Sequence, residues 1–398
     1  MFINHKKDNM LRKVVLIYVL LAGTLVYGQK FDGLALTPPM GWNSWNKFGC
    51  DVSEKLIKEI ADAIVSSGMK DAGYEYVVID DCWQVDRDEN GNIVPDPERF
   101  PNGMKHVVDY VHSLGLKFGI YSDAGTKTCQ GRPGSRGYEF QDARTYAAWG
   151  VDYVKYDWCH TSTQNAKASY TLMRDAIHKA GRPIVFSICE WGLSKPWTWA
   201  KDVGHLWRTT DDIMDCWDCV DERNNAGFTV LLDRVVGLES YSDPGHWNDP
   251  DMLEVGNSGL TVSESRAHFS LWCILASPLM AGNDLRDMTA ETKEILMNKE
   301  AIAVDQDSLG KTGVKVRDDG DLEVWVKQLA DGSRGVVLFN RGLTSEKMTV
   351  KWTEMGYPPY LKALVRDLWQ HKDMGKFKDE YSAEVPSHDA VMLRVTPL

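Results

Sequence analysis

The stretch YEYVVIDDCW, at positions 74–83, has the composition of a buried strand that ends in two carboxylates and a tryptophan. Apolar runs of the same kind recur at 40–46, 117–123, 151–159, 184–191, 206–213, 246–253 and 274–284. Helical spacing of apolar residues separates or follows them, at 53–72, 104–114, 142–149, 166–180, 225–238, 263–273 and 289–297, with a short, weaker pattern at 196–203. This alternation of strands and helices predicts an α/β fold with a mostly parallel sheet and helices outside it.

The number and the ends of these strands favour a closed barrel. Eight strand–helix units are what a (β/α)8 TIM barrel needs. The alternative is an open, doubly wound sheet, but no glycine-rich phosphate turn follows the first strand. Nearly every expected strand ends in polar or aromatic residues, which are Trp45, Asp80, Asp81, Asp123, Asp157, Glu190, Asp212, Asp251 and Asp284. A closed barrel gathers such strand ends on one face, where active sites lie, whereas an open sheet spreads them along an edge.

The pattern changes near residue 310. From there the chain has short alternating runs without helical spacing, at 322–329, 335–340, 347–352, 363–369 and 390–395. Such runs predict a small antiparallel β domain, which we expect to be a β-sandwich. The expected organisation is therefore a signal peptide at 1–28, a (β/α)8 catalytic barrel at 29–310 and a C-terminal antiparallel β domain at 311–398.

The N-terminus has the features of an export signal. An apolar run at 14–27 follows four positive charges and is too short for a comfortable membrane span. The charges are Lys6, Lys7, Arg12 and Lys13, and Val26 and Gly28 stand at a plausible cleavage position. The alternative is an uncleaved anchor. We expect an exported protein, periplasmic or secreted, without a further membrane-crossing segment.

Composition and cysteine count narrow the function classes. The chain has 45 Lys plus Arg against 57 Asp plus Glu, a net charge of −12, which argues against non-specific nucleic-acid binding. Its 43% hydrophobic residues exclude a mainly disordered chain. Export favours disulfides among the eight cysteines. Cys216 and Cys219 form a C-x-x-C pair without a second ligand pair, so a local disulfide or free thiols are expected rather than a zinc or redox site.

Two carboxylates carry the candidate chemistry. Alternation along 151–159 places Lys155 and Asp157 on the same side of one strand. A neighbouring cation keeps a carboxylate ionised, as a nucleophile requires, although a buried ion pair that only ties strands together has the same pattern. Along 206–213 alternation groups Arg208, Thr210 and Asp212. An Asp near other carboxylates can act as a general acid, and the alternative is a helix N-cap.

A pair of carboxylates from different strands, at the carboxyl end of a barrel, matches the needs of glycoside cleavage. The further acids Asp80, Asp81 and Asp251 suit a polyhydroxyl ligand. A metal hydrolase is the main competitor, but the sequence has no His-x-His at a strand end and no His-Glu-x-x-His helix. It also lacks Gly-x-Ser-x-Gly, which argues against a serine hydrolase.

At these residues the sequence resembles glycoside hydrolase family 27, the clan D α-galactosidases. The matching strings are LTPPMGWNSWNKFGCDV (36–52), VVIDDCWQ (77–84), FGIYSDAGTKTC (118–129), VDYVKYDWC (151–159), ICEWG (188–192), WRTTDDI (207–213), HWNDPDML (246–253) and ASPLMAGNDLR (276–286). The resemblance implies a (β/α)8 barrel with a C-terminal antiparallel β domain. It also implies retention of configuration through a covalent glycosyl-enzyme, with no metal or other cofactor.

The resemblance also implies roles for individual residues. Asp157 matches the family's nucleophile and Asp212 its acid/base, while Asp211 stands where the family usually has Gly or Ala. The family's sugar contacts correspond to Trp45, Asp80, Asp81, Tyr121, Lys155, Arg208 and Asp251. Its disulfides correspond to Cys50–Cys82 and Cys129–Cys159, which leaves Cys189, Cys216, Cys219 and Cys273 without an assigned partner.

Specificity within the family can also be argued from residues. Glu190 and Leu193 match positions near the sugar's 2-substituent, where they would crowd an acetamido group. Asp80 and Asp81 are both present, whereas β-L-arabinopyranosidase relatives replace one Asp of this pair with an apolar residue. We therefore expect a retaining exo-α-galactosidase acting on galactose-containing saccharides. The alternatives are a β-L-arabinopyranosidase or α-N-acetylgalactosaminidase of the same family, or a non-catalytic sugar-binding protein.

Overall fold

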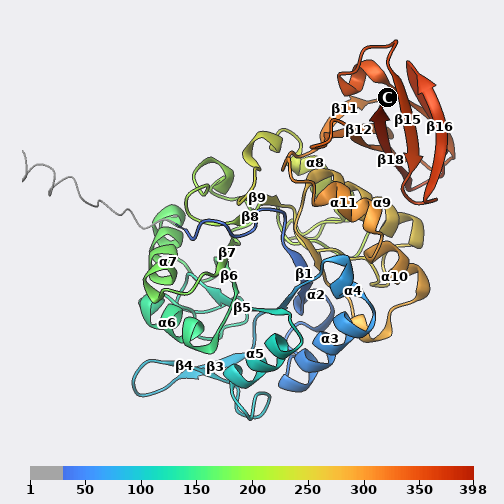
Figure 1. The fold of residues 1–398 in the computed structure, drawn as a ribbon. Coiled ribbons are helices and arrows are strands. Elements are labelled where there is room, and N and C mark those ends of the chain that lie inside the picture. The colour runs from blue at the N-terminus through green and yellow to red at the C-terminus, as the bar shows by residue number, and fades with distance from the viewer. Residues whose placement is uncertain (1–29) are drawn as a thin grey trace, which may run out of the picture.

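The structure is a computed structural model that describes residues 30–398 (Figure 1). The expected signal peptide at 1–28 lies outside the described residues. Among residues 30–398, no helix is long and apolar enough to cross a membrane.

Eight parallel strands form the central sheet, in the order β10-β1-β2-β5-β6-β7-β8-β9, with the helices outside it (Figure 1). They are β1 (Met40–Asn43), β2 (Tyr76–Ile79), β5 (Lys117–Asp123), β6 (Tyr153–Asp157), β7 (Val185–Ile188), β8 (Leu206–Arg208), β9 (Trp247–Asp249) and β10 (Leu279–Ala281). A parallel bridge between Leu253, just after β9, and Ala281 of β10 joins the two ends of the sheet. The prediction of a (β/α)8 barrel is confirmed.

The barrel interior is filled with side chains below the strand ends. The inward-facing cluster includes Tyr76 and Val78 of β2, Tyr153 of β6, Leu206 of β8 and Trp247 of β9, all buried. This packed layer closes the lower part of the barrel, as in other barrels of this class. Polar side chains can therefore collect only above it, at the carboxyl ends of the strands.

The helices that cover the barrel follow the apolar spacing of the sequence. They are α2 (Trp45–Phe48), α3 (Glu54–Ser66), α4 (Met69–Ala72), α5 (Met104–Ser113), α6 (Glu139–Trp149), α7 (Ala166–Ala180), α8 (Phe228–Val235), α9 (Val262–Leu275), α10 (Ala290–Leu296) and α11 (Lys299–Asp305). The expected cap is present at α3, where Ser53 Oγ accepts a hydrogen bond from the Leu56 backbone N–H (3.2 Å).

Three expected boundaries need correction. The pattern at 53–72 forms two helices instead of one, because Gly68 adopts a left-handed conformation (φ 89°) between α3 and α4. The strand expected at 274–284 begins only at Leu279, since Ile274 and Leu275 complete α9. The segment 196–203 contains only a short 3₁₀ helix, Pro196–Thr198, and the hairpin of β3 (Gln84–Arg87) and β4 (Ile93–Pro95) was not predicted.

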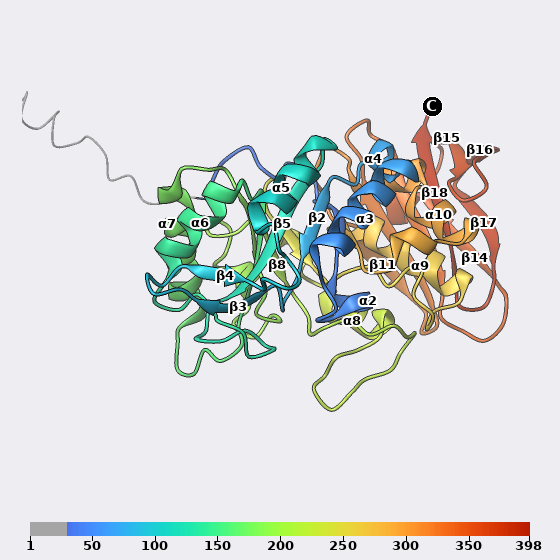
Figure 2. The same ribbon diagram turned by 90° about the horizontal axis from the view of Figure 1, so that it is seen from below.

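The C-terminal part is an antiparallel β structure (Figure 2). Its strands are β11 (Val314–Asp318), β12 (Leu322–Gln328), β13 (Arg334–Asn340), β14 (Glu346–Lys351), β15 (Lys362–Asp367), β16 (Lys372–Lys378), β17 (Glu380–Val385) and β18 (Asp389–Pro397). Six of them form one sheet, β11-β12-β13-β18-β15-β16, and β14 pairs with β17. Side chains of both sheets, among them Val336 of β13, Val350 of β14 and Val385 of β17, share one buried cluster, as in a sandwich.

The β structure packs on the barrel through apolar side chains. Trp325, Phe339 and Met392 belong to the same buried cluster as Phe269 and Trp272 of α9. Lys327 is fully buried at this interface. Its Nζ donates hydrogen bonds to the backbone carbonyls of Asp305 (3.2 Å) and Cys273 (3.4 Å), as a buried polar group requires. The two parts are held together by core-like packing.

Helix α3 offers a matched test of how the helices dock on the barrel. Ile60 is fully buried and Val65 is 40% exposed on the same helix. Ile60→Ala should lower the free energy of unfolding by about 2–5 kcal/mol, because it removes buried contacts and leaves a cavity. Val65→Ala should change it by less than about 0.5 kcal/mol. Urea unfolding of both variants measures this, and equal effects would contradict the docking of α3.

Candidate active site

A cavity of about 630 Å³ opens at the carboxyl ends of the barrel strands, within the range of roughly 300–1,000 Å³ that small-molecule sites occupy. The structure brings together most of the expected site residues around it. The expected residues that line the cavity are Trp45, Asp80, Asp81, Tyr121, Lys155, Asp157, Arg208, Asp212 and Asp251. They come from β1, β2, β5, β6, β8 and β9 or from the residues that directly follow these strands.

Strand alternation places Lys155 and Asp157 in this cavity. Tyr153, two residues before Lys155, belongs to the inward-facing cluster that fills the barrel. The side chains at 155 and 157 share its direction and therefore emerge above that cluster. The β6 register that buries Tyr153 thus also presents a cation and a carboxylate to the cavity.

Asp157 is buried and held in position by donors. Tyr121 Oη donates to Asp157 Oδ2 (2.8 Å), and the Trp158 backbone N–H donates to Oδ1 (2.9 Å). Burial raises the pKa of Asp157, with the charge of Asp212 acting in the same direction, while Lys155 and the Tyr121 hydrogen bond oppose the shift. The carboxylate is thus fixed by two donors, and the charges of Lys155 and Asp212 act on its pKa in opposite directions.

Asp212 lies in the same cavity but in a different electrostatic setting. Its Oδ1 accepts hydrogen bonds from Trp191 Nε1 and from Arg208 Nη2, both at 3.1 Å. Burial alone would raise the pKa of Asp212, but Arg208 and Lys155 together hold it below its usual value. The two carboxylates therefore face one cavity with pKa values displaced in opposite directions.

Asp211 is directed elsewhere. Its Oδ2 accepts a hydrogen bond from Arg234 Nη1 (2.8 Å) on α8, and it does not line the cavity. Strand β8 ends at Arg208, short of the limit of 213 that the sequence predicted, so strand alternation does not extend to Asp211 and Asp212. Of the two neighbouring carboxylates, the cavity therefore receives only that of Asp212.

Two cations, Lys155 and Arg208, form ion pairs with the other carboxylates of the site. Lys155 Nζ donates to Asp80 Oδ2 (2.8 Å), which also accepts from Asn43 Nδ2 (2.8 Å). Arg208 Nη2 lies 3.0 Å from Asp251 Oδ2 as well as 3.1 Å from Asp212 Oδ1. Lys155 therefore neutralises a carboxylate that follows β2, Arg208 neutralises carboxylates that follow β8 and β9, and all of these side chains line the cavity.

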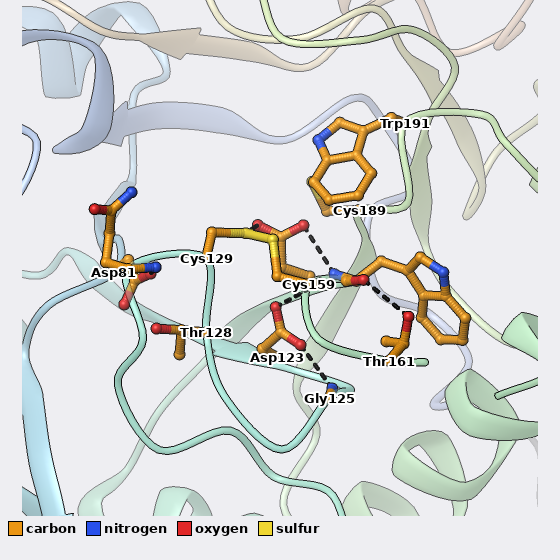
Figure 3. The surroundings of a disulfide bond; sticks show 12 residues. Asp81, Asp123, Gly125, Thr128, Cys129, Cys159, Thr161, Cys189 and Trp191 are labelled. Atoms are coloured by element: carbon orange, nitrogen blue, oxygen red, sulfur yellow. Dashed lines mark hydrogen bonds between the residues drawn. A yellow bond between two sulfur atoms is a disulfide. The ribbon is translucent and has the colours of Figure 1, made fainter. Parts of the chain in front are cut away.

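A disulfide forms part of the cavity wall (Figure 3). Cys129 and Cys159 are bonded, and Cys129 Sγ lies 3.5 Å from Asp157 Oδ2. Beneath the bond, Asp123 accepts hydrogen bonds from the backbone N–H groups of Gly125 (2.6 Å) and Cys159 (2.9 Å), as Figure 3 shows. The disulfide thus ties the segments after β5 and β6 together beside Asp157.

The other cysteines form two further disulfides and two thiols. Cys50 is bonded to Cys82, and Cys216 to Cys219, so the C-x-x-C pair is a local disulfide. Cys189 and Cys273 are free and buried. In the described part of the chain, metal-type ligand atoms gather at Asp123, Cys129 and Cys159, but both sulfurs are consumed by the disulfide.

The expectation for Glu190 and Leu193 needs correction. Glu190 is fully buried and accepts a hydrogen bond from the Ser194 backbone N–H (2.7 Å), while Leu193 is 68% exposed, and neither lines the cavity. The chain turns after β7, with Trp191 at φ 56°, so that the indole of Trp191 faces the cavity instead. Strand alternation does not extend past such a turn.

Sequence reasoning also missed residues that line the cavity from its loops. They are Asn46, Lys47, Gly49, Cys129, Trp191, Ile213, Met214, Asp215, Arg223, Asn225, Met252, Glu254, Asn257 and Ser258. Several of them lie within the strings that match the family, at 36–52, 118–129, 188–192, 207–213 and 246–253, but those strings gave them no role in binding. The folding of separate connections onto one barrel face brings them together.

A barrel with two carboxylates facing one polar cavity has the arrangement that a glycoside hydrolase requires. Comparisons with known proteins give the family: residues 37–307 match the family described as alpha galactosidase A, and residues 319–395 match the alpha galactosidase C-terminal beta sandwich domain. The chain belongs to the alpha-galactosidase family.

Similar proteins span nearly the whole chain. Alpha-galactosidase A of Cellvibrio japonicus is 52% identical over 401 residues, covering 96% of this chain and 97% of the relative. Alpha-galactosidase of Coffea arabica is 50% identical over 368 residues, covering 92% and 95%. Among solved structures, alpha-galactosidase I of Mortierella vinacea has a TM-score of 0.90 at 41% identity, covering 92% of this chain and 98% of that chain. The Saccharomyces cerevisiae alpha-galactosidase with raffinose has a TM-score of 0.89 at 30% identity, covering 93% and 100%.

The hydrogen bond from Trp191 to Asp212 generates a prediction for the pH profile of aryl α-galactoside hydrolysis. The N–H stabilises the ionised form of Asp212, so Trp191→Phe should raise the pKa of this carboxyl. In the protein without substrate the pKa of Asp212 is the lower of the two, so Asp212 governs the acid limb of the bell-shaped kcat/KM profile, and this limb should move to higher pH by up to about one unit.

Trp199→Phe serves as the matched control, because Trp199 Nε1 bonds only to Ser194 and does not line the cavity. The control profile should match that of the unaltered protein. An acid limb that stays in place, or moves to lower pH, in Trp191→Phe would show that Asp212 does not set it.

Proposed function

We propose that this protein is a retaining exo-α-galactosidase that releases terminal α-D-galactosyl residues from saccharides. The observation that carries the proposal is that Asp157 and Asp212, from different strands, line the same cavity. The membership of the chain in the alpha-galactosidase family and the names of its relatives support the substrate. No cofactor is needed, because two carboxyl groups suffice for glycoside cleavage.

In the first step, an Asp157 oxygen attacks the anomeric carbon while the bond from that carbon to the leaving oxygen breaks. Asp212 gives its proton to that oxygen, and a covalent galactosyl ester on Asp157 results. In the second step, Asp212 removes a proton from water, the water oxygen bonds to the anomeric carbon, and Asp157 is released. The sugar keeps its configuration because its anomeric carbon is inverted twice.

Binding of the sugar must also move one proton from Asp157 to Asp212. Within the protein alone, the charges favour the shared proton on Asp157, since Arg208 and Lys155 stabilise ionised Asp212. A bound galactoside reverses this preference, because its glycosidic oxygen accepts a hydrogen bond from protonated Asp212. The positive charge that develops at the anomeric carbon likewise favours ionised Asp157. The pair is active only when it holds one proton.

Galactose specificity rests on the acids at the end of β2. Asp80 is bonded to Lys155 and Asn43, and Asp81 accepts from the backbone N–H groups of Cys82 (2.7 Å) and Gln130 (3.0 Å). Both line the cavity, where they can accept hydrogen bonds from sugar hydroxyl groups.

The galactose specificity can be tested with a panel of three aryl glycosides: α-galactoside, α-N-acetylgalactosaminide and β-L-arabinopyranoside. We expect the protein to hydrolyse the α-galactoside in preference to the other two.

We also propose that the protein is exported, to the periplasm or outside the cell, with 1–28 as a signal peptide, the barrel at 29–310 and the β domain at 311–398. Three disulfides support an oxidising compartment. N-terminal sequencing of the mature protein from the native cells tests the cleavage site.

Asp157→Ala tests the nucleophile. Hydrolysis of a nitrophenyl α-galactoside should fall by more than about 10³-fold, because the covalent step is lost. Added azide should restore turnover and give the β-galactosyl azide, since it attacks from the side that Asp157 occupied. Near-normal hydrolysis without azide would refute the role of Asp157.

The neighbours Asp211 and Asp212 give a matched pair for the acid/base. Asp212→Asn should lower kcat/KM for the nitrophenyl galactoside by about 10²–10⁴-fold, the range of general acid catalysis. Asp211→Asn should change it by less than about threefold, because Asp211 bonds to Arg234 outside the cavity. The reverse order of effects would assign the acid/base to Asp211.

A further inference from the structure

The cavity continues beyond Asp212 on one side of the barrel mouth. Its lining there comes from the connections after β8, β9 and β1, which are near neighbours in the barrel order. The residues are Lys47 after β1, Met214, Asp215, Arg223 and Asn225 after β8, and Asn257 and Ser258 after β9. Tyr121 and Asp157 stand on β5 and β6, which lie opposite β9 and β10 in the order of the closed barrel.

The position of Asp212 gives this region a chemical role. In the proposed function, Asp212 hands its proton to the oxygen of the leaving group, so the leaving group begins beside Asp212. Met214 and Asp215 follow Asp212 by two and three residues in the same connection. The segment 214–226, called the β8–α8 loop below, therefore borders the space that the leaving group occupies.

The accessible groups of this region suit a hydroxyl-rich leaving group. Lys47, Arg223 and Ser258 are exposed, and the Arg223 side chain retains 84% of its accessible surface. Such groups donate hydrogen bonds to sugar hydroxyls, whereas an apolar leaving group would take them out of water without a partner. The lining favours a second sugar over a lipid.

Internal bonds give the β8–α8 loop a fixed shape. Cys216 and Cys219 are joined, and Asp221 accepts hydrogen bonds from the backbone N–H groups of Arg223 (2.8 Å) and Asn225 (2.9 Å). Asp215 Oδ2 accepts from the Gly259 backbone N–H (2.6 Å), which docks the loop on the connection after β9. A Cβ at Gly259 would lie 1.8 Å from the Asp215 carbonyl oxygen, so only glycine permits this approach.

Residues of the C-terminal β domain pack against the β8–α8 loop. The ring of Trp217, between the two bonded cysteines, stacks on His388 with ring centres 4.3 Å apart and an angle of 9° between the planes. Trp217 also contacts Phe228 of α8 and Phe339 of β13. His388, in turn, bonds through Nδ1 to Glu264 Oε1 of α9 (2.9 Å).

We propose that the β8–α8 loop forms a binding position for the second sugar of the substrate, and that the C-terminal domain positions this loop through the stacking of Trp217 on His388. The proposal rests on the proposed function and names its substrate class, an α-galactosyl group linked to another sugar. Arg223 binds the second sugar, and Trp217 and His388 are positioning residues.

The test compares raffinose with α-galactosyl fluoride, whose leaving group is a single atom and needs no second position. Arg223→Ala should lower kcat/KM for raffinose about three- to tenfold, the effect of one lost charged hydrogen bond at a half-open site, and leave the fluoride unchanged. Arg144→Ala, an exposed arginine on α6 outside the cavity, should alter neither substrate.

His388→Ala tests the positioning role. It should raise KM for raffinose about threefold or more with little change in kcat, and leave kinetics on the fluoride unchanged. His388→Phe should restore the raffinose KM, because it retains a ring for Trp217 to stack on. His371→Ala is the matched control, since His371 also bonds the β domain to the barrel, at Glu300 Oε1 (2.8 Å), but away from the cavity.

The outcomes separate the two proposals. If the unaltered protein hydrolyses neither substrate, the proposed function fails. If it hydrolyses both and Arg223→Ala and His388→Ala leave raffinose kinetics unchanged, the second-sugar position is refuted. Equal losses on raffinose and the fluoride would also refute it, because they would place the effect at the galactose position or in the fold.

Discussion

Several carboxylates lie close together at the mouth of this barrel, and two cations, Lys155 and Arg208, compensate their charges. Lys155 is paired with Asp80, and Arg208 bridges Asp212 and Asp251. Removing one partner of a buried ion pair costs about 3–5 kcal/mol, because the other charge is left uncompensated. The site thus depends on a cation of β6 that reaches a carboxylate after β2, and on a cation of β8 that reaches carboxylates after β8 and β9. The same two cations line the cavity, so they also determine the net charge of the surface that a bound sugar contacts.

This electrostatic arrangement links the fold to the chemistry. Inward-facing Tyr153 and Leu206 fill the barrel below, so the next inward positions on β6 and β8 carry Lys155 and Arg208. The cations favour ionised Asp212 in the protein alone, and in the proposed mechanism the glycosidic oxygen of a bound substrate draws the proton from Asp157 onto Asp212. Tyr121 and the adjacent disulfide fix Asp157 at the same time. Catalysis therefore uses a preorganised site in which the substrate moves one proton.

The barrel and the position of Asp157 were predictable because they follow from periodicity. The helix expected at 166–180 has those limits in the structure, where Asn165 caps its first turn, and alternation along β6 correctly placed Lys155 and Asp157 on one side. Asp212 lies beyond the end of β8, where alternation does not apply, so only the resemblance to the family motif pointed to it. The prediction failed where the chain leaves a regular element. Trp191 takes the place expected for Glu190 and Leu193 because of a turn with positive φ. Strand β16 was missed because its polar residues lack a clear alternation, and Arg223 reaches the cavity only through the folding of a loop.

The most direct measurement is mass spectrometry of the protein after reaction with a 5-fluoro-galactosyl fluoride, which slows the second step and lets the covalent intermediate accumulate. Peptide mapping should find one added fluorogalactosyl group on Asp157, and Asp212→Asn should retain the labelled position because fluoride needs no acid to leave. A label on another residue, or turnover that passes through no covalent species and inverts the sugar, would contradict the assignment of Asp157 and Asp212 to one galactose ring.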